Sequence, residues 1–136
     1  MSTYRFTIPG RLPDLNEYVL AERSHRIKGA KMKAESERLI RACIRKQLGK
    51  IKLKPPVFFD YLFIEKDRRR DKSNISAYAR KVIEDSVVKE GLLPNDGWKE
   101  IDDYHDSFAV DKDNPRIEMT LIEVENDSKR SAAARA

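Results

Sequence analysis

Two aspartates, Asp71 and Asp96, are the side chains in this sequence best suited to bind a divalent cation. Asp71 directly follows three arginines, Arg68, Arg69 and Arg70, while Asp96 lies in an Asn-Asp-Gly turn. Mg²⁺ keeps several waters and needs only one or two protein carboxylates beside substrate phosphate oxygens, and guanidinium groups are planar forks for those oxygens. The pattern therefore indicates metal-assisted phosphodiester cleavage. The alternative interpretation is a solvated charge run at a strand end and an aspartate that only shapes a turn.

The charge of the chain changes sign along its length. Residues 22–54 carry twelve Lys or Arg against three Asp or Glu, a net charge of +9, whereas residues 84–127 carry four against fourteen, a net charge of −10. A basic first half suits a polyanion such as DNA, while an acidic half must face away from that partner or bind cations. Lys28, Lys31 and Lys33 begin a basic helix after a loop, so they are candidates for phosphate contact, with solvated lysines as the alternative.

Length and composition indicate one cytoplasmic domain. A chain of 136 residues can bury a core without disulfides, and its single cysteine, Cys43, cannot form an internal bridge. The first residues lack the layout of a signal peptide, and no apolar run is long enough to span a bilayer, so we expect no membrane partner. We expect residues 1–125 to form the domain and residues 126–136, which have no core-forming residue beyond alanine, to be a disordered tail.

Periodic patterns predict the elements that position these residues. We expect an α+β fold in which a small mixed sheet of about four strands packs with two main helices. The apolar run over residues 57–64 predicts a central strand that leads directly to Asp71. The other expected elements are a strand over 4–8, an irregular loop over 11–28, a basic amphipathic helix over 29–48, a possible edge segment over 50–54, a second helix over 73–90, a turn over 92–97, and strands over 98–108 and 117–124. We expect the second helix and the turn to bring Asp71 and Asp96 to one edge of the sheet.

The residues around Asp71 resemble the motif of the RusA family of Holliday-junction resolvases, which are usually encoded by prophages. The specific part of the resemblance is Arg-Arg-Arg-Asp71-Lys-Ser-Asn74, combined with Lys81 on the following helix and with a helix end at Gly91 before Asn95-Asp96. The run from Pro13 to Tyr18 and the basic helix after it also resemble the family, so the likeness extends to about residue 125.

The resemblance implies an α+β homodimer that binds Mg²⁺ or Mn²⁺ through acidic residues and cuts opposed strands of a four-way DNA junction in recombination and repair. Asp71 matches the family's first metal-binding aspartate, Asp96 the essential aspartate of the turn, and Lys81 the active-site lysine. The match of Lys81 needs about one extra helical turn after Asn74. Four inserted residues rotate a helical position by only about 40°, so Lys81 stays near the same face.

One position departs from the family motif. Where the family commonly has a second aspartate two residues after the first, this chain has Ser73, which offers no carboxylate. Asn74 could supply a neutral oxygen, or one of the acids Asp67, Asp85 and Asp102 could be recruited; Ser73 could also be a helix N-cap. The alternative function is a junction-binding or regulatory protein with weak or no cleavage. A third is a plain RNA- or DNA-binding module without a metal site.

The remaining aromatic, histidine and cysteine side chains suggest structural roles. His25 and His105 have no partner at ligand spacing, so we assign them surface or structural roles. We expect Trp98 and Tyr104 to pack on the sheet rather than to stack on bases, and Cys43 to lie in the core.

Overall fold

The computed structural model describes residues 2–125, and the expected tail of residues 126–136 lies outside them. In chain order the elements are β1 (Thr3–Pro9), α1 (Leu15–Ser24), α2 (Arg26–Gln47), β2 (Val57–Glu65), α3 (Lys72–Lys89), β3 (Ile101–Val110) and β4 (Arg116–Glu123). The predicted α+β class is confirmed, with three helices where the sequence predicted two.

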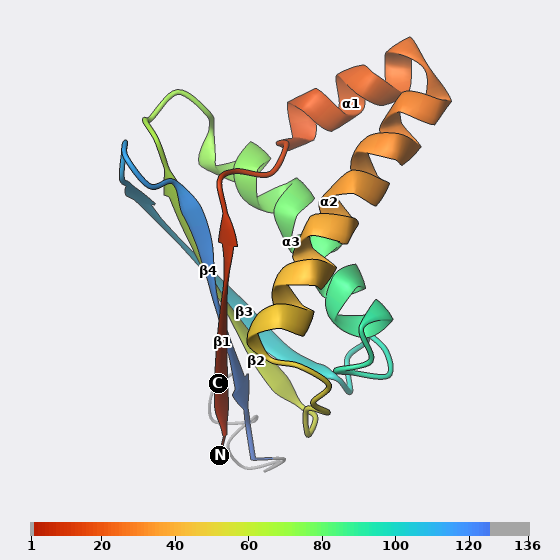
Figure 1. The fold of residues 1–136 in the computed structure, drawn as a ribbon, viewed down its shortest axis with the longest axis vertical. Coiled ribbons are helices and arrows are strands. Elements are labelled where there is room, and N and C mark those ends of the chain that lie inside the picture. Colours follow the sequence, from red (N-terminus) through yellow and green to blue (C-terminus); the bar gives the residue numbers. More distant parts are fainter. Residues whose placement is uncertain (1, 126–136) are drawn as a thin grey trace.

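The four strands form one mixed sheet in the order β1-β4-β2-β3. β4 lies antiparallel to both β1 and β2, whereas β2 and β3 are parallel and are joined by α3. Parallel neighbours need a long crossover between them, and α3 supplies it. The three described helices lie on one side of the sheet, where α2 and α3 contact the strands and α1 packs on α2 and α3 (Figure 1).

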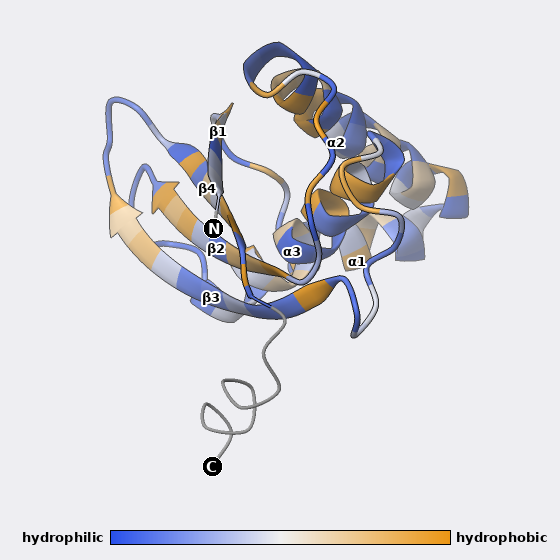
Figure 2. Ribbon diagram, turned by 90° about the horizontal axis from the view of Figure 1, so that it is seen from below, coloured by the Kyte–Doolittle hydropathy of each residue, from blue (hydrophilic) through white to orange (hydrophobic). Residues whose placement is uncertain are grey.

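The core lies between the sheet and the helices. Alternation along β2 turns Phe59, Tyr61 and Phe63 toward the helices, and these residues are 1%, 0% and 0% exposed. Ile83 of α3 is 0% exposed and belongs to the same core cluster, and Cys43 is buried as predicted. In Figure 2 hydrophobic positions alternate with hydrophilic ones along strands and helices, as expected for elements with one buried face. This packing fixes α3, which carries the candidate residues Asn74 and Lys81 and begins directly after Asp71.

The region predicted as an irregular loop over residues 11–28 instead forms α1 and the first turn of α2. Asp14 and Glu17 form a capping box: Asp14 Oδ1 accepts from the Glu17 N–H at 2.9 Å, and Glu17 Oε1 accepts from the Asp14 N–H at 3.3 Å. His25 caps α2, because its Nδ1 accepts a hydrogen bond from the Ile27 N–H at 3.1 Å. The structural role assigned to His25 is therefore confirmed.

Residues 50–54, predicted as a possible edge segment, belong to no strand. The Leu53 N–H donates to the Leu92 carbonyl oxygen at 2.8 Å, which attaches this segment to the loop after α3, and the Lys54 N–H donates to the Glu123 side chain at 2.6 Å without forming a strand ladder. β3 begins later than predicted, at Ile101, because residues 98–100 form a turn. The other three strands and the second predicted helix agree with the prediction to within one residue at each end.

Candidate functional site

α3 separates Asp71 from Asp96. β2 ends shortly before Asp71, and α3 then runs back along the sheet, so that β3 begins beside the start of β2, where Val57 is in register with Ile101. Asp96 precedes Ile101 by five residues and lies at that second edge. The expectation that Asp71 and Asp96 share one edge is therefore wrong within a single chain. The 18 residues of α3 lie between them in the sequence, and Asp96 contacts α3 at Lys81, ten residues after Asp71.

The Asp71 end of α3 presents an exposed carboxylate. Asp71 is the N-cap residue, yet its side chain makes no capping hydrogen bond. Ser73 is exposed inside the first turn, so the interpretation of Ser73 as the N-cap is wrong. Asn74 lies in the same turn and belongs with Asp71 rather than with Asp96. These three positions thus gather at one end of the helix, as the motif spacing predicts.

Arg70, one of the predicted phosphate contacts, is bound inside the protein. Its guanidinium donates twice to the Glu65 carboxylate, at 2.8 Å in each case, and once to the Leu12 carbonyl oxygen at 2.9 Å. Its Nη1 also lies 3.9 Å from the Asp14 carboxylate, which ties the start of α1 to the end of β2. The side chain of Arg70 is 12% exposed. Its guanidinium therefore stabilises the fold in this state instead of facing a ligand.

Four other cations predicted to contact phosphate remain exposed. Arg68 and Arg69 lie at the surface, where Arg69 Nε is 3.6 Å from Asp67 Oδ2. Lys28 and Lys31 are exposed near the start of α2 and line a pocket of about 460 Å³ on that side of the molecule. Weak surface pairing leaves these side chains available to phosphate oxygens.

Lys81 links Asp96 to a chain of ion pairs that reaches α2. Its Nζ lies 3.4 Å from Asp96 Oδ2 and 3.3 Å from Asp85 Oδ1. Asp85 Oδ2 in turn lies 3.4 Å from Nζ of Lys33, so this predicted phosphate contact already has a carboxylate partner. The hydrogen bond to Asp85 is the largest cause that raises the pKa of Lys81, and the charge of Asp96 adds to it. The ammonium of Lys81 consequently stays charged at neutral pH.

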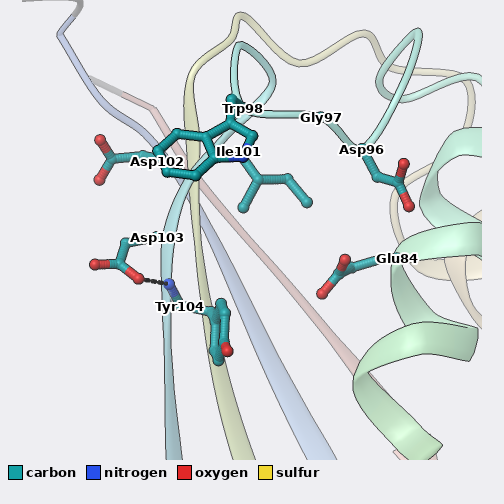
Figure 3. A pocket seen from close by; sticks show the side chains of 8 residues that line it. All are labelled: Glu84, Asp96, Gly97, Trp98, Ile101, Asp102, Asp103 and Tyr104. Atoms are coloured by element: carbon teal, nitrogen blue, oxygen red, sulfur yellow. Dashed lines mark hydrogen bonds between the residues drawn. The ribbon is translucent and has the colours of Figure 1, made fainter. Parts of the chain in front are cut away.

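Asp96 also lines an open pocket of about 460 Å³ between α3 and the start of β3 (Figure 3). We name it the acidic pocket after Glu84, Asp96, Asp102 and Asp103, which line it. Glu84 and Asp96 lie on its α3 side, opposite Asp102 and Asp103 (Figure 3). Burial raises the pKa of Glu84 and the charge of Asp96 raises it further, whereas the hydrogen bond that Tyr61 donates to Glu84 at 3.1 Å lowers it.

Glu84 and Asp96 are the carboxylates that could hold a divalent cation. Their mutual repulsion contributes to the raised pKa of Glu84, and a cation would relieve it. Among residues 2–125 no three His, Cys, Asp or Glu side chains form a group able to hold a metal. A cation here would complete its shell with water and substrate phosphate oxygens, as Mg²⁺ commonly does. Of the acids considered as replacements for the family aspartate, Asp102 lines the pocket, Asp85 lies beside it on α3, and Asp67 lies before the other end of α3.

Trp98, which we expected to pack on the sheet, is 91% exposed, so that expectation is wrong. Tyr104 does pack: its ring lies edge-on to Tyr61, with centroids 6.5 Å apart, and the Arg80 guanidinium lies 4.6 Å from its centroid. His105 is exposed on β3, in agreement with a surface role.

Comparisons with protein-family models and with curated proteins assign no role to these residues. No protein-family model matches the chain, and no curated protein matches it. Within residues 2–125 no helix is long and apolar enough to cross a membrane. The likeness to the RusA family therefore stays a hypothesis that rests on the motif residues and on the contact between Lys81 and Asp96.

Proposed function

We propose that this protein is a metal-dependent endonuclease that hydrolyses phosphodiester bonds in branched DNA such as the Holliday junction. One observation carries the proposal. The resemblance assigns Lys81 and Asp96, 15 residues apart in the sequence, to one active site, and Lys81 Nζ lies 3.4 Å from Asp96 Oδ2. Asp96 lines the open acidic pocket and the Lys81 side chain is 62% exposed, so an extended substrate has access to the pair.

In this proposal the chain supplies negative charge for a cation and positive charge for the phosphate. Glu84 and Asp96 would hold Mg²⁺ or Mn²⁺, which when bound polarises a phosphoryl oxygen and activates water. Lys81 orients the Asp96 carboxylate through their ion pair. Its side chain is 62% exposed, so the same ammonium can also face a phosphate and stabilise the negative charge that develops there. Asp71 remains a second candidate ligand at the other end of α3.

Cations at the far end of α3 and on α2 would bind the DNA backbone. Arg68 and Arg69 precede α3, and Lys28 and Lys31 lie near the start of α2. Phosphate contacts of this kind are independent of sequence and weaken steeply as salt rises. Specificity for branched DNA would then come from the shape of the substrate and from the contacts at the cutting site.

A homodimer and a cytoplasmic location belong to the same proposal. Resolving a junction takes two symmetrical cuts, and a two-fold assembly provides two equivalent sites. The single cysteine, Cys43, is buried and forms no disulfide, which suits the cytoplasm.

The direct test is cleavage of a synthetic four-way junction by the purified protein, with and without Mg²⁺ or Mn²⁺. We expect cuts that need the metal, and an Asp96→Asn variant that binds the junction without cutting it. Asp71→Asn is the matched comparison, because it changes a carboxylate of the same kind at the opposite end of α3. Wild-type cleavage that persists in both variants would show that other carboxylates act, and binding without any cleavage would overturn the enzyme assignment.

A second candidate is a protein that binds junctions and does not cut them. The observation that favours it is the Asp71 end of α3, where Ser73 offers no carboxylate and Asp96 instead contacts Lys81, ten residues after Asp71. The same assay separates the two candidates. A Ser73→Asp variant that cuts when the wild type does not would locate the missing ligand at this end of the helix.

A further inference from the structure

Trp98 presents an exposed aromatic surface on an ordered turn. It is the single tryptophan of the chain and is 91% exposed. The Glu100 and Ile101 N–H groups donate to the Gly97 carbonyl oxygen, at 3.2 and 3.0 Å, and these bonds close the turn around Trp98. An indole held this way can give a large apolar contact at little entropic cost, because only two side-chain torsions need to be fixed.

The indole forms one wall of the acidic pocket. Figure 3 shows it above Ile101, with Asp102 and Asp103 on the β3 side and Glu84 and Asp96 across the pocket. The space of about 460 Å³ is within the range of pockets that take small organic groups. A ligand for this place must therefore offer a flat face to the indole and hydrogen-bond donors or positive charge to Glu84 and Asp96.

A nucleobase meets these requirements better than a second copy of the chain does. Its ring face stacks on an indole, and an exocyclic amino group such as that of cytosine can donate to a carboxylate. A second copy placed symmetrically over Trp98 would bring two acidic pockets together, and like charges across an interface are unfavourable.

We infer that Trp98 is a stacking platform for an unpaired base next to the cutting site. The inference rests on the proposed function for the identity of the polymer. Trp98 follows Asp96 by two residues, so a base on the indole places its own or a neighbouring phosphate near the Lys81 and Asp96 pair. An intact duplex hides the faces of its bases, whereas a branch point can release one. Trp98 thus selects branched over linear DNA.

The first test uses the fluorescence of Trp98, which no other tryptophan obscures. Wild-type protein is titrated with an unlabelled four-way junction in EDTA, so that no cleavage interferes. We expect saturable quenching by the junction, and weaker quenching by a duplex of equal length and by a junction with abasic sites at its centre. Unchanged emission while the anisotropy of a labelled junction shows binding would overturn the inference.

The second test compares substitutions of Trp98 by the anisotropy of labelled DNA. We expect Trp98→Ala to bind the junction about tenfold more weakly and the duplex unchanged, and Trp98→Phe to stay within about threefold of the wild type, because base stacking is lost only in the alanine variant. Because Trp98 is exposed, we expect its substitutions to leave the fold intact, and a melting curve of each variant checks this. Equal junction affinity in all three proteins would overturn the inference, as would a change in oligomeric state on Trp98→Ala.

These results are separable from the fate of the proposed nuclease function. Quenching and affinity are measured in EDTA, and cleavage is measured in Mg²⁺ on the same junction. Stacking without cleavage would support the inference and overturn the enzyme assignment. Cleavage by Trp98→Ala with unchanged affinity and selectivity would support the enzyme assignment and overturn the inference. Failure to bind any DNA in EDTA would overturn the inference, and failure to bind in Mg²⁺ as well would also overturn the enzyme assignment.

Discussion

Replacing Arg70 with alanine is expected to destabilise the fold, although this arginine stands in a run that suggests phosphate binding. Its guanidinium makes three hydrogen bonds, two to Glu65 and one to the Leu12 carbonyl oxygen. It is also the cation nearest to the buried Asp14 carboxylate in the described structure, at 3.9 Å. The substitution removes these contacts and leaves two carboxylates in a largely buried environment.

The magnitude follows from what the substitution leaves behind. The side chains of Glu65 and Asp14 are 13% and 9% exposed, so water screens their charges poorly once Arg70 is gone. Removing one partner of a buried ion pair costs about 3–5 kcal/mol, and we expect about 3 kcal/mol because Asp14 keeps its hydrogen bond to the Glu17 N–H. A loss of this size is a large part of the 5–15 kcal/mol or so that typical domains possess.

The assay is urea unfolding of the wild type, Arg70→Ala, Arg70→Lys and Arg69→Ala. Arg69→Ala is the matched control, because the Arg69 side chain is 88% exposed and its surface pair with Asp67 is worth at most about 1 kcal/mol. Arg70→Lys should fall between the wild type and Arg70→Ala, since an ammonium keeps the charge but cannot make the paired contact to Glu65. A loss below about 1 kcal/mol for Arg70→Ala, similar to the control, would refute the structural role of Arg70.

Two further predictions concern the α1 and α2 pair and the acidic pocket. A Cβ on Gly29 would collide with Glu22 Cγ and lie 3.3 Å from Glu22 Cα. Gly29→Ala should therefore push α1 from α2 and lower the unfolding free energy by about 1–3 kcal/mol, and an unchanged urea midpoint would contradict this close packing. Burial and the charge of Asp96 raise the pKa of Glu84 above its ordinary value of 4.5. The folded state favours protonated Glu84, so this contribution to stability is present below pH 4.5 and is lost as pH rises through the folded-state pKa. Gln carries no charge at any pH, so the unfolding free energy of Glu84→Gln should rise relative to that of the wild type from pH 4.5 upward. A difference in unfolding free energy that stays flat with pH would exclude this coupling.

The elements with a strong apolar period could be predicted from sequence, and α1 could not. β2 and α3 match their predicted ranges because each buries a full face against the other layer. α1 has no fully buried residue, so its period is weak, and its clearest signal is the capping box of Asp14 and Glu17. That spacing was present in the sequence and would have located the start of the helix.

The site was predicted in its parts but not in its arrangement. The motif paired Lys81 with Asp96, and the two side chains are in contact. The grouping of Asp71 with Asp96 overlooked topology: a helix between two parallel strands returns the chain to the edge where the first strand began, so residues at its two ends cannot meet within one chain. Glu84 was missed because it lies on a half-buried face, although its position one turn after Lys81 was a usable signal. Trp98 was misplaced because the turn of residues 98–100 interrupts the apparent strand.

The most direct test of the central claim, that Lys81 and Asp96 form one active site, is a double-mutant cycle on the rate of junction cleavage. Rates are measured at saturating protein with Mg²⁺ for the wild type, Lys81→Met, Asp96→Asn and the double variant. The account predicts that each single change slows cleavage by about a hundredfold or more, and that the double variant is no slower than the slower single one, because catalytic groups that act as a unit are not additive. Independent, multiplying effects, or an Asp96→Asn rate close to that of the wild type, would contradict it.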